Sequence, residues 1–543
     1  MSSTKGLKSK SAQADEQFQA ALAIARSGET ERAMRSLERA LKLELRHRGI
    51  RNALGVLRLE TGDAEGAVAL LKPLARELAD VAGVQINFGN ALIALRRADE
   101  AIAPLKRATV LEPSSALVWY GYGRALQIAG RAAEAEPAYR NALQRDPSHI
   151  ETRANLAAAC NFQDRYDNGE LQARTAIAMA PQHAGAHVNL SMSLLAQRRW
   201  AEGWSEYEWR EATDLLGAQR RAWAMPRWNG EAVNGKTVLV HAEQGFGDTI
   251  QFARYLPALR ERGARVVLQC SATLVELIRH AELADDVVVN TDALPAHDYQ
   301  VPLTGLPHRL GLVTSDAVYV SDTPYLHALP SRVSPLPVRA SGARLRVGFV
   351  WAGSPTMMNE MNRGCGLEAL LPLLAMNDVE WVSLQCGPRA ADLASLPPDV
   401  RVHDLSSRLK DFADTSAVMI ELDVVISTCT AVAHLAGALG RECWTLLPKV
   451  GLDWRWAGDA LLDEERRTRW YESVWGVRQS VPQDWSEPVQ RLRARLEERL
   501  AEGAQERLAD AKGESVASSY FGSTKGHPES GLLWNTTTMR RTD

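Results

Sequence analysis

One interval, of about 34 residues, recurs from the beginning of the chain to near position 215 and constrains the fold more than any other feature. Small residues and prolines return at this interval: Pro113, Pro147 and Pro181; Ala33, Ala67, Ala101 and Ala135; Gly55, Gly89 and Gly123. A fixed period of this length predicts stacked helix pairs, each too small to bury its apolar face alone. Six pairs fit between positions 15 and 215, and the first and last are degenerate, as expected of units that cap a stack.

Each recurring residue type has a physical reason at its position. Glycine and alanine let two helices cross at short distance, and proline ends each pair because it cannot continue a helix. Gly169 and Gly203 replace alanine in the last two pairs, which should weaken those helices. This pattern predicts a tetratricopeptide-repeat array over residues 15–215, an α-solenoid.

Three asparagines share one phase of the repeat and are predicted to line its concave wall: Asn87, Asn155 and Asn189. An asparagine amide offers both a donor and an acceptor, which suits binding of an extended peptide backbone. The alternative is that asparagine at this phase only caps or solvates a helix.

After a linker over residues 216–235, the pattern changes to strand, glycine loop and helix. A strand at 237–241 precedes Gly245 and Gly247, and a helix over 248–262 leads to a strand at 265–269. A second unit begins at 346–351, with strands at 381–385, 422–427 and 442–447. We therefore expect two Rossmann-like halves, residues 236–335 and 344–480, with a cleft between them. A helix over 481–512 should follow, and residues 1–14 and 513–543 should be disordered.

Composition excludes several classes of function. A net charge of −3 without a basic stripe argues against a nucleic-acid binder. No apolar run reaches the roughly 18 residues of a membrane span. Six scattered cysteines without a Cys-x-x-Cys pair favour reduced thiols and a cytoplasmic location. The sequence has no Asp-x-Asp pair, so we expect no metal and no cofactor.

Five spans together resemble one known family. They are Glu243-Gln-Gly-Phe-Gly-Asp-Thr-Ile-Gln-Phe-Ala-Arg-Tyr255, Gly348-Phe-Val-Trp-Ala-Gly-Ser354, Asp411-Phe-Ala-Asp-Thr415, Thr430-Ala-Val-Ala-His-Leu-Ala-Gly437 and Asp453-Trp-Arg-Trp456. The chain resembles bacterial tetratricopeptide-repeat glycosyltransferases, whose catalytic half is similar to the lipopolysaccharide heptosyltransferases. The resemblance implies two Rossmann domains of the GT-B type and metal-independent sugar transfer. It also implies a nucleotide-sugar donor and a protein or glycan acceptor bound through the repeat groove. Some members of the family modify flagellin or other proteins, and others act on cell-surface glycans.

The resemblance assigns a general base to Asp248, which would take a proton from the acceptor hydroxyl. The alternative is a helix N-cap, where aspartate is favoured without any catalysis. On the donor side, the resemblance places the diphosphate at the start of a helix containing Thr430, Ala431 and His434, where backbone N–H groups would replace a metal. A packed histidine is the alternative for His434.

Gly353 and Ser354 would shape the other lip of the donor pocket, and Arg363 would contact phosphate. A surface ion pair is the alternative for Arg363. The chain departs from the family in this pocket. Cys429 replaces an aspartate, Met357-Met358-Asn359 replaces His-Lys-Asn, and Gly364 follows Arg363 where serine is usual.

These observations predict a cytoplasmic, metal-independent glycosyltransferase that recruits its acceptor through the repeat array. The alternative is a non-catalytic interaction scaffold with a degenerate donor site, which Cys429 and Met357-Met358 favour. A nicotinamide dehydrogenase is disfavoured because the chain lacks a Gly-x-Gly-x-x-Gly sequence.

Overall fold

The computed structural model describes residues 9–213, 223–291, 293–319, 324–332, 336–339, 345–355, 357, 359–460 and 467–512. The chain divides between Arg493 and Ala494 into two compact units.

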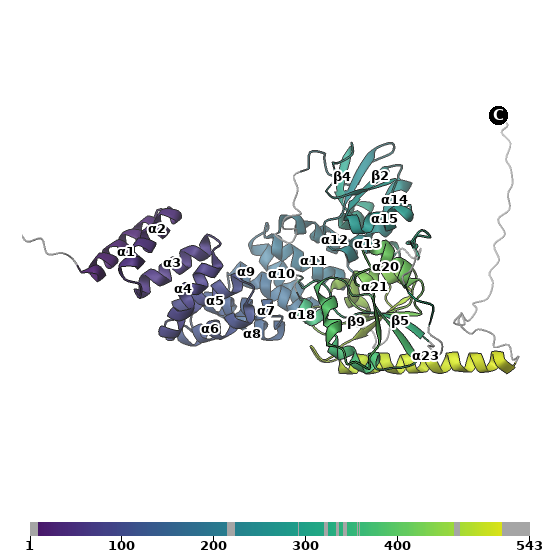
Figure 1. Ribbon diagram of the computed structural model, residues 1–543. Coiled ribbons are helices and arrows are strands. Elements are labelled where there is room, and N and C mark those ends of the chain that lie inside the picture. Colours follow the sequence, from purple (N-terminus) through teal and green to yellow (C-terminus); the bar gives the residue numbers. More distant parts are fainter. Residues whose placement is uncertain are drawn as a thin grey trace, which may run out of the picture. The chain divides into compact units, whose positions relative to one another are not determined.

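The first twelve helices form six consecutive pairs, as the repeat predicts (Figure 1). The pairs are α1 Lys10–Arg26 with α2 Thr30–Leu43, α3 Arg48–Glu60 with α4 Ala64–Glu77, α5 Ala82–Ala94 with α6 Ala98–Leu111, α7 Ala116–Ile128 with α8 Ala132–Arg145, α9 Ile150–Asn161 with α10 Tyr166–Met179, and α11 Ala184–Ala196 with α12 Trp200–Tyr207. From α3 onward, the first helices of successive pairs start at a constant interval, which is the interval of the sequence repeat. Pro113, Pro147 and Pro181 lie between pairs, where the sequence places them.

The glycines at the helix crossings have the predicted role. A Cβ added to Gly55, Gly89 or Gly123 would come within 2.5–2.7 Å of a side chain on the second helix of the same pair: Leu71, Leu105 or Tyr139. That distance is far below van der Waals contact, so a larger residue cannot enter without displacing the second helix.

Two further repeated features stabilise the ends of these helices. The turn inside each pair contains one residue with positive φ, again in phase with the repeat: Gly28, Gly62, Arg96, Gly130, Asp164 and Arg198. In addition, three histidines cap first helices, because the Nδ1 of His47, His149 and His183 accepts the backbone N–H three residues later. The histidines satisfy backbone N–H groups at helix starts, and the positive-φ residues turn the chain between the two helices of a pair. Both features recur at the interval of the repeat.

The chain then forms a four-stranded sheet in which every pairing is parallel, with the order β3-β2-β1-β4. Its strands are β1 Thr237–His241, β2 Arg265–Cys270, β3 Asp286–Val289 and β4 Tyr299–Pro302. The associated helices are α13 Phe246–Phe252, α14 Leu256–Glu261, α15 Ala272–His280, α16 Leu306–Leu310 and α17 Ser315–Val318.

A second sheet has six parallel strands in the order β10-β9-β8-β5-β6-β7. These are β5 Leu345–Val350, β6 Val379–Ser383, β7 Val402–Asp404, β8 Val424–Thr428, β9 Cys443–Leu447 and β10 Val474–Arg478. The accompanying helices are α18 Glu360–Arg363, α19 Leu371–Leu374, α20 Phe412–Met419, α21 Ala431–Ala438, α22 Trp454–Ala460 and α23 Ser486–Lys512. Every residue of β5, β6, β8 and β9 is buried, as expected of a parallel sheet covered on both faces.

Several boundaries differ from the prediction. Helix α1 begins at Lys10, inside the segment 1–14 that we expected to be disordered. The single helix expected over 248–262 is divided into α13, the 3₁₀ turn Ala253–Tyr255 and α14, because Pro257 interrupts the backbone hydrogen bonds. The predicted tail 513–543 and much of the linker, residues 214–222, lie outside the described residues.

One hydrophobic core joins the last repeat to both sheets. It contains Trp200 and Trp204 of α12, Phe252 of α13, and Trp454 and Trp470 of the second sheet's unit. Ring centroids of Trp204 and Trp454 lie 5.5 Å apart, and those of Trp200 and Trp470 lie 6.3 Å apart. The end of the array is therefore part of the same core as the α/β region. No described helix is long and apolar enough to cross a membrane.

The helix crossings can be tested at Gly89. Gly89→Ala should lower the free energy of unfolding by about 1–2 kcal/mol, because its methyl group collides with Leu105. Gly83→Ala on the same helix is the control: nothing lies within 4 Å of the added carbon. That variant should gain about 0.5–1 kcal/mol from helix propensity. Urea denaturation followed by circular dichroism measures both, and equal effects would contradict the crossing model.

Candidate functional site

The strand orders define two places where a ligand is expected. In each sheet the chain first winds to one side and then to the other, and parallel α/β folds bind ligands in a crevice beyond the carboxyl ends of the two strands at such a switch point. In the first sheet these strands are β1 and β4, followed by the glycine loop and by Thr304. In the second they are β5 and β8, followed by Gly353 and by Thr430. The glycine loop, Gly353 and Thr430 were predicted, and they follow β1, β5 and β8, whereas Thr304 after β4 was not predicted.

The two crevices are brought together by helices α13 and α21, which pack on each other. The contact is made at Gly247, where an added Cβ would lie 2.9 Å from His434 Cδ2 and 3.5 Å from Ala431 Cα. Beside it, Phe246 of α13 forms an edge-to-face aromatic pair with Phe412 of α20, with centroids 5.4 Å apart. Glycine is needed at position 247 because the start of α21 occupies the space of any side chain.

Asp248 lies at this contact. It caps helix α13, but from the third helical position: the N-cap residue is Gly245, and Asp248 Oδ2 accepts its backbone N–H at 3.0 Å. Its Oδ1 lies 2.6 Å from Arg455, and 23% of the side chain is still exposed. The carboxylate is therefore held from two sides and still reaches solvent.

Arg455 joins the two α/β halves. Its guanidinium is buried and contacts Asp248, Asp453 at 3.0 Å, and the Oε1 of Gln251 at 2.9 Å. The planar group also lies over the rings of Trp454 and Phe252. Asp248 and Gln251 belong to α13, and Asp453 precedes α22. The Arg455 cation therefore links the glycine loop to the α/β half that contains the second sheet.

Two carboxylates share this one cation, and their environments drive their pKa values apart. Burial raises the pKa of Asp248, and Arg455 offsets this only in part. Burial also acts to raise the pKa of Asp453, but its ion pair with Arg455 prevails and holds that pKa below the usual value. Divergent carboxylates of this kind are typical of sites that transfer protons.

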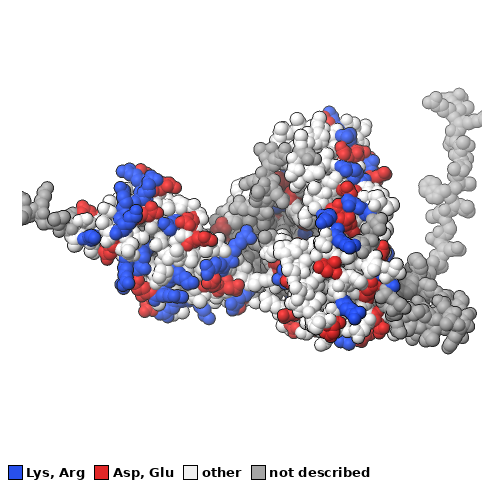
Figure 2. Space-filling view, viewed as in Figure 1, with Lys and Arg blue, Asp and Glu red and all other residues white. Residues whose placement is uncertain are grey.

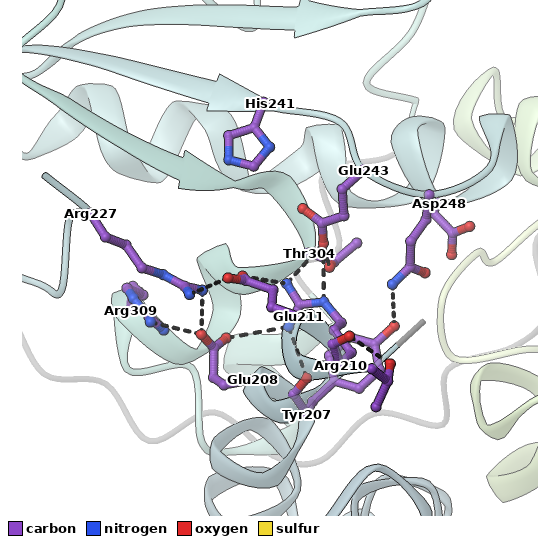
Figure 3. A network of polar contacts seen from close by, with 12 residues as sticks. Tyr207, Glu208, Arg210, Glu211, Arg227, His241, Glu243, Asp248, Thr304 and Arg309 are labelled. Atoms are coloured by element: carbon purple, nitrogen blue, oxygen red, sulfur yellow. Dashed lines mark hydrogen bonds and ion pairs between the residues drawn. The ribbon is translucent and has the colours of Figure 1, made fainter. Parts of the chain in front are cut away.

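A second buried network supports the glycine loop from the end of the array (Figure 3). Arg210 follows α12 and is 1% exposed, and it donates to Glu243 at 2.8 Å. Glu243 also accepts from Thr304, so it bridges the segments after β1 and β4. Around this pair, Glu208 contacts Arg309 and Arg227, and Arg227 contacts Glu211. Three arginines and three glutamates balance in charge, which limits the electrostatic cost of burying them.

The donor-side loop is held by Glu360, which the sequence analysis did not identify. The Oε1 of Glu360 accepts the backbone N–H of Gly353 at 2.5 Å. A Cβ on Gly353 would lie 2.7 Å from Glu360 Oε2, which explains the glycine. Ser354 continues the same loop, and Asn359 donates to the carbonyl of Gly451 at 2.8 Å.

Arg363 is not in the surface ion pair considered as an alternative. It donates to the carbonyl of Cys429 at 2.6 Å, so it lies beside the start of α21. Burial raises the pKa of the Cys429 thiol, which makes a nucleophilic thiolate unfavourable there. Thr430 is the residue before α21, and its hydroxyl lies 3.1 Å from that of Ser427.

The three predicted groove asparagines each connect neighbouring repeats. The amide nitrogens of Asn87, Asn155 and Asn189 donate to the residue 35 positions earlier: to Asn52 Oδ1 at 3.0 Å, to the Tyr120 hydroxyl at 3.5 Å and to the Ala154 carbonyl at 2.9 Å. All three are only partly buried. They are thus neither helix caps nor purely solvated, and their amide oxygens accept no hydrogen bond from the described residues.

The residues missed by sequence reasoning are those that hold others in place: Arg210, Glu243, Glu360 and Arg455. Glu243 and Arg455 lie inside two of the spans that resemble the family, but the sequence analysis assigned them no role. Their charge beside apolar residues was the available signal. In the described part of the chain, no group of three His, Cys, Asp or Glu side chains could hold a metal ion. A cavity of about 1250 Å³ lies away from the glycine loop, between Cys365–Pro372, Arg389–Ser395 and the first turns of α23.

Comparison with known proteins identifies the class of the N-terminal part. The family model for the tetratricopeptide repeat matches residues 18–80 and 86–150. Residues of the helical part therefore form a tetratricopeptide-repeat array.

A curated relative, Protein FlbA of Caulobacter vibrioides, is 28% identical over 283 residues. That alignment covers 47% of this chain and 46% of FlbA, so the chain spans about half the length of this relative. Solved repeat proteins are among the structures that match. They include YrrB, described as a TPR protein with an unusual peptide-binding site (19% identity, TM-score 0.29, 31% of this chain and 88% of that one). A thermophilic TPR protein of Thermus thermophilus, TTC0263, is 22% identical with a TM-score of 0.28, over 34% and 99% of the two chains. MamA of Desulfovibrio magneticus RS-1 is 17% identical with a TM-score of 0.30, over 33% and 99%.

The Arg455 link can be tested by removing its charge. Arg455→Met should cost about 1–3 kcal/mol of stability, because the side chains of Asp248 (23% exposed) and Gln251 lose a charged hydrogen-bond donor, while Asp453 is 47% exposed and can be solvated. Adding Asp248→Asn and Asp453→Asn should recover most of that loss. Arg97→Met is the control, since its pair with Glu100 is exposed and should contribute under about 1 kcal/mol. The midpoint of tryptophan fluorescence in urea measures each variant, and no recovery in the triple variant would contradict the charge argument.

Proposed function

We propose that the protein is a metal-independent glycosyltransferase of the GT-B type, which moves a sugar from a nucleotide-sugar donor to a protein or glycan acceptor. The observation that carries the proposal is the packing of α13 on α21. It brings Asp248 from one parallel sheet to the residues that follow β8 of the other. Ligands of parallel α/β folds bind at such crevices.

The donor diphosphate would lie at the first turn of α21. The backbone N–H groups at a helix start favour negative charge, and Ala431 and its neighbours expose them without bulky side chains. Arg363 would add a positive charge beside Cys429, and Gly353 would form the opposite lip. No metal is required in this arrangement, because the helix and the guanidinium supply the electrostatic stabilisation.

Asp248 would act as the general base. Its oxygen would take the proton of the acceptor hydroxyl while that oxygen forms the bond to the anomeric carbon, and the nucleotide diphosphate would leave with the bonding electrons. A raised pKa makes the carboxylate a better proton acceptor, and the 23% exposure of its side chain leaves a path for the acceptor.

The acceptor would be recruited by the repeat array. Tetratricopeptide arrays bind proteins, and the surface shown in Figure 2 mixes Lys and Arg with Asp and Glu instead of presenting a field of one sign. A groove of this kind would recognise peptide backbone through the asparagine amides more than charge. Free cysteine thiols throughout the described residues support the predicted cytoplasmic location.

One observation favours the second candidate, a scaffold with a degenerate donor site. Arg363 donates to the Cys429 carbonyl, and the lysine of the family's His-Lys-Asn stretch is replaced by Met358, which lies outside the described residues. A pocket with one cation already engaged binds a diphosphate less tightly. The two candidates differ in whether any nucleotide sugar binds.

The donor test is a thermal-shift screen against UDP-, GDP-, ADP- and CMP-sugars in the presence of a chelator. One donor should raise the melting temperature, since a ligand that binds only the native state stabilises it. No shift with any donor, from protein shown to be folded, would favour the scaffold. With a responding donor, Asp248→Asn should keep binding and lower transfer about 10²–10⁴-fold. Wild-type transfer should fall as the pH drops through the raised pKa of Asp248, because the base must be unprotonated.

The groove can be tested with the triple variant Asn87→Ala, Asn155→Ala and Asn189→Ala. We expect weaker capture of the acceptor with unchanged donor binding. Because each amide also ties two repeats, the variant should lose up to about 3 kcal/mol of stability, at roughly 1 kcal/mol per hydrogen bond. Asn141→Ala is the control: its amide donates within its own helix, to Pro137. Capture by both variants at wild-type level, measured by calorimetry on the isolated acceptor, would exclude the asparagines from binding.

A further inference from the structure

His434 has a neighbour that the motif does not account for. The imidazole is 6% exposed on α21, and its Nδ1 lies 3.0 Å from the hydroxyl of Tyr471, just before β10. The edge of the ring that carries Cδ2 and Nε2 lies against Gly247 of the glycine loop. Among the described residues, no hydrogen bond is made to Nε2. One ring nitrogen is therefore engaged inside the protein, and the other faces the contact between the two crevices.

The position of Tyr471 is fixed by packing. A Cβ on Gly437 would collide with the Tyr471 ring, so glycine on α21 creates the space that the phenol fills. Tyr471 is 1% exposed, and the guanidinium of Arg254 lies over its ring at 4.7 Å. The phenol has no room to turn away from His434.

The chemistry of the two groups favours one direction for this hydrogen bond. Among the described residues, the hydrogen bond of the Tyr471 hydroxyl is the one to Nδ1 of His434. Arg254 covers the face of the Tyr471 ring and donates to the hydroxyl of Tyr325, which donates its own proton to the carbonyl of Ile250 at 2.9 Å. A phenol is the better donor of the pair and a neutral imidazole nitrogen is the better acceptor, so the Tyr471 O–H donates to Nδ1 of His434.

An imidazole that accepts at Nδ1 has its proton on Nε2. Burial, with the nearby charge of Arg455, lowers the pKa of His434 to about 3, so the ring stays neutral at ordinary pH. A neutral imidazole is a hydrogen-bond donor and not a source of positive charge.

We propose that Tyr471 is a positioning residue: its hydroxyl donates to His434 Nδ1 and fixes the imidazole as the Nε2–H form, which presents a hydrogen-bond donor to an anionic oxygen beside the contact of α13 with α21. The ligand class is a phosphate ester. The role toward a sugar donor rests on the function proposed above, whereas the protonation of the ring does not.

The test is nuclear magnetic resonance of the full chain with ¹⁵N in its histidine rings. The sequence has 12 histidines, and His434→Gln assigns the relevant signal by its loss. At neutral pH the wild-type spectrum should show a protonated Nε2 and an unprotonated, hydrogen-bonded Nδ1. Tyr471→Phe keeps the ring volume and should shift the Nδ1 resonance toward that of a nitrogen without a donor. Tyr325→Phe is the matched control, because its hydroxyl donates to Ile250, and it should leave His434 unchanged.

A proton on Nδ1 in the wild type would overturn the inference, and so would an Nδ1 resonance unaffected by Tyr471→Phe. Where the thermal-shift screen finds a donor, Tyr471→Phe should weaken its binding about tenfold and Tyr325→Phe should not. The absence of donor binding would refute the glycosyltransferase proposal and leave the result on the ring protonation standing.

Discussion

Burial of the tryptophans at the end of the array is the interaction on which the rest of the structure depends. Trp200 and Trp204 project from the last repeat into the core that holds Phe252, Trp454 and Trp470. Large aromatic side chains release more free energy on burial than any others, and here they come from three separate parts of the chain. The last repeat therefore forms one side of the α/β core. The array is packed directly onto the part of the chain that holds the candidate site.

The polar groups near this core follow from that packing. Arg210 and Arg455 are each taken out of water by the aromatic core, and a buried guanidinium needs carboxylates and backbone carbonyls around it. Arg210 recruits Glu243 at the start of the glycine loop, and Arg455 recruits Asp248 at its end. The loop is held at both ends by charges belonging to other segments, which gives the candidate base a defined position without a ligand.

Much of the fold could be predicted because it is periodic. Gly89 against Leu105 and Pro113 between pairs follow from the repeat, since each position meets the same neighbour in every unit. Strands β3, β4, β7 and β10 were not predicted. The first three have only three or four residues and β10 is only partly buried, so none combines the length and burial of the predicted strands. Likewise Asp248 could be selected from its motif, but neither Arg455 nor Tyr471 could be linked to it, since both belong to the other α/β half of the chain.

The sequence by itself determined the helical repeat, the glycine positions and the order of buried strands, because all of these depend on neighbours that are close along the chain. Only the tertiary structure decided which charges meet. It placed Asp248 beside Arg455, Gly353 beside Glu360 and His434 beside Tyr471. The physical reason is that electrostatic and hydrogen-bond energies depend on distance in space and on burial. Neither quantity can be inferred from the spacing of residues along the chain.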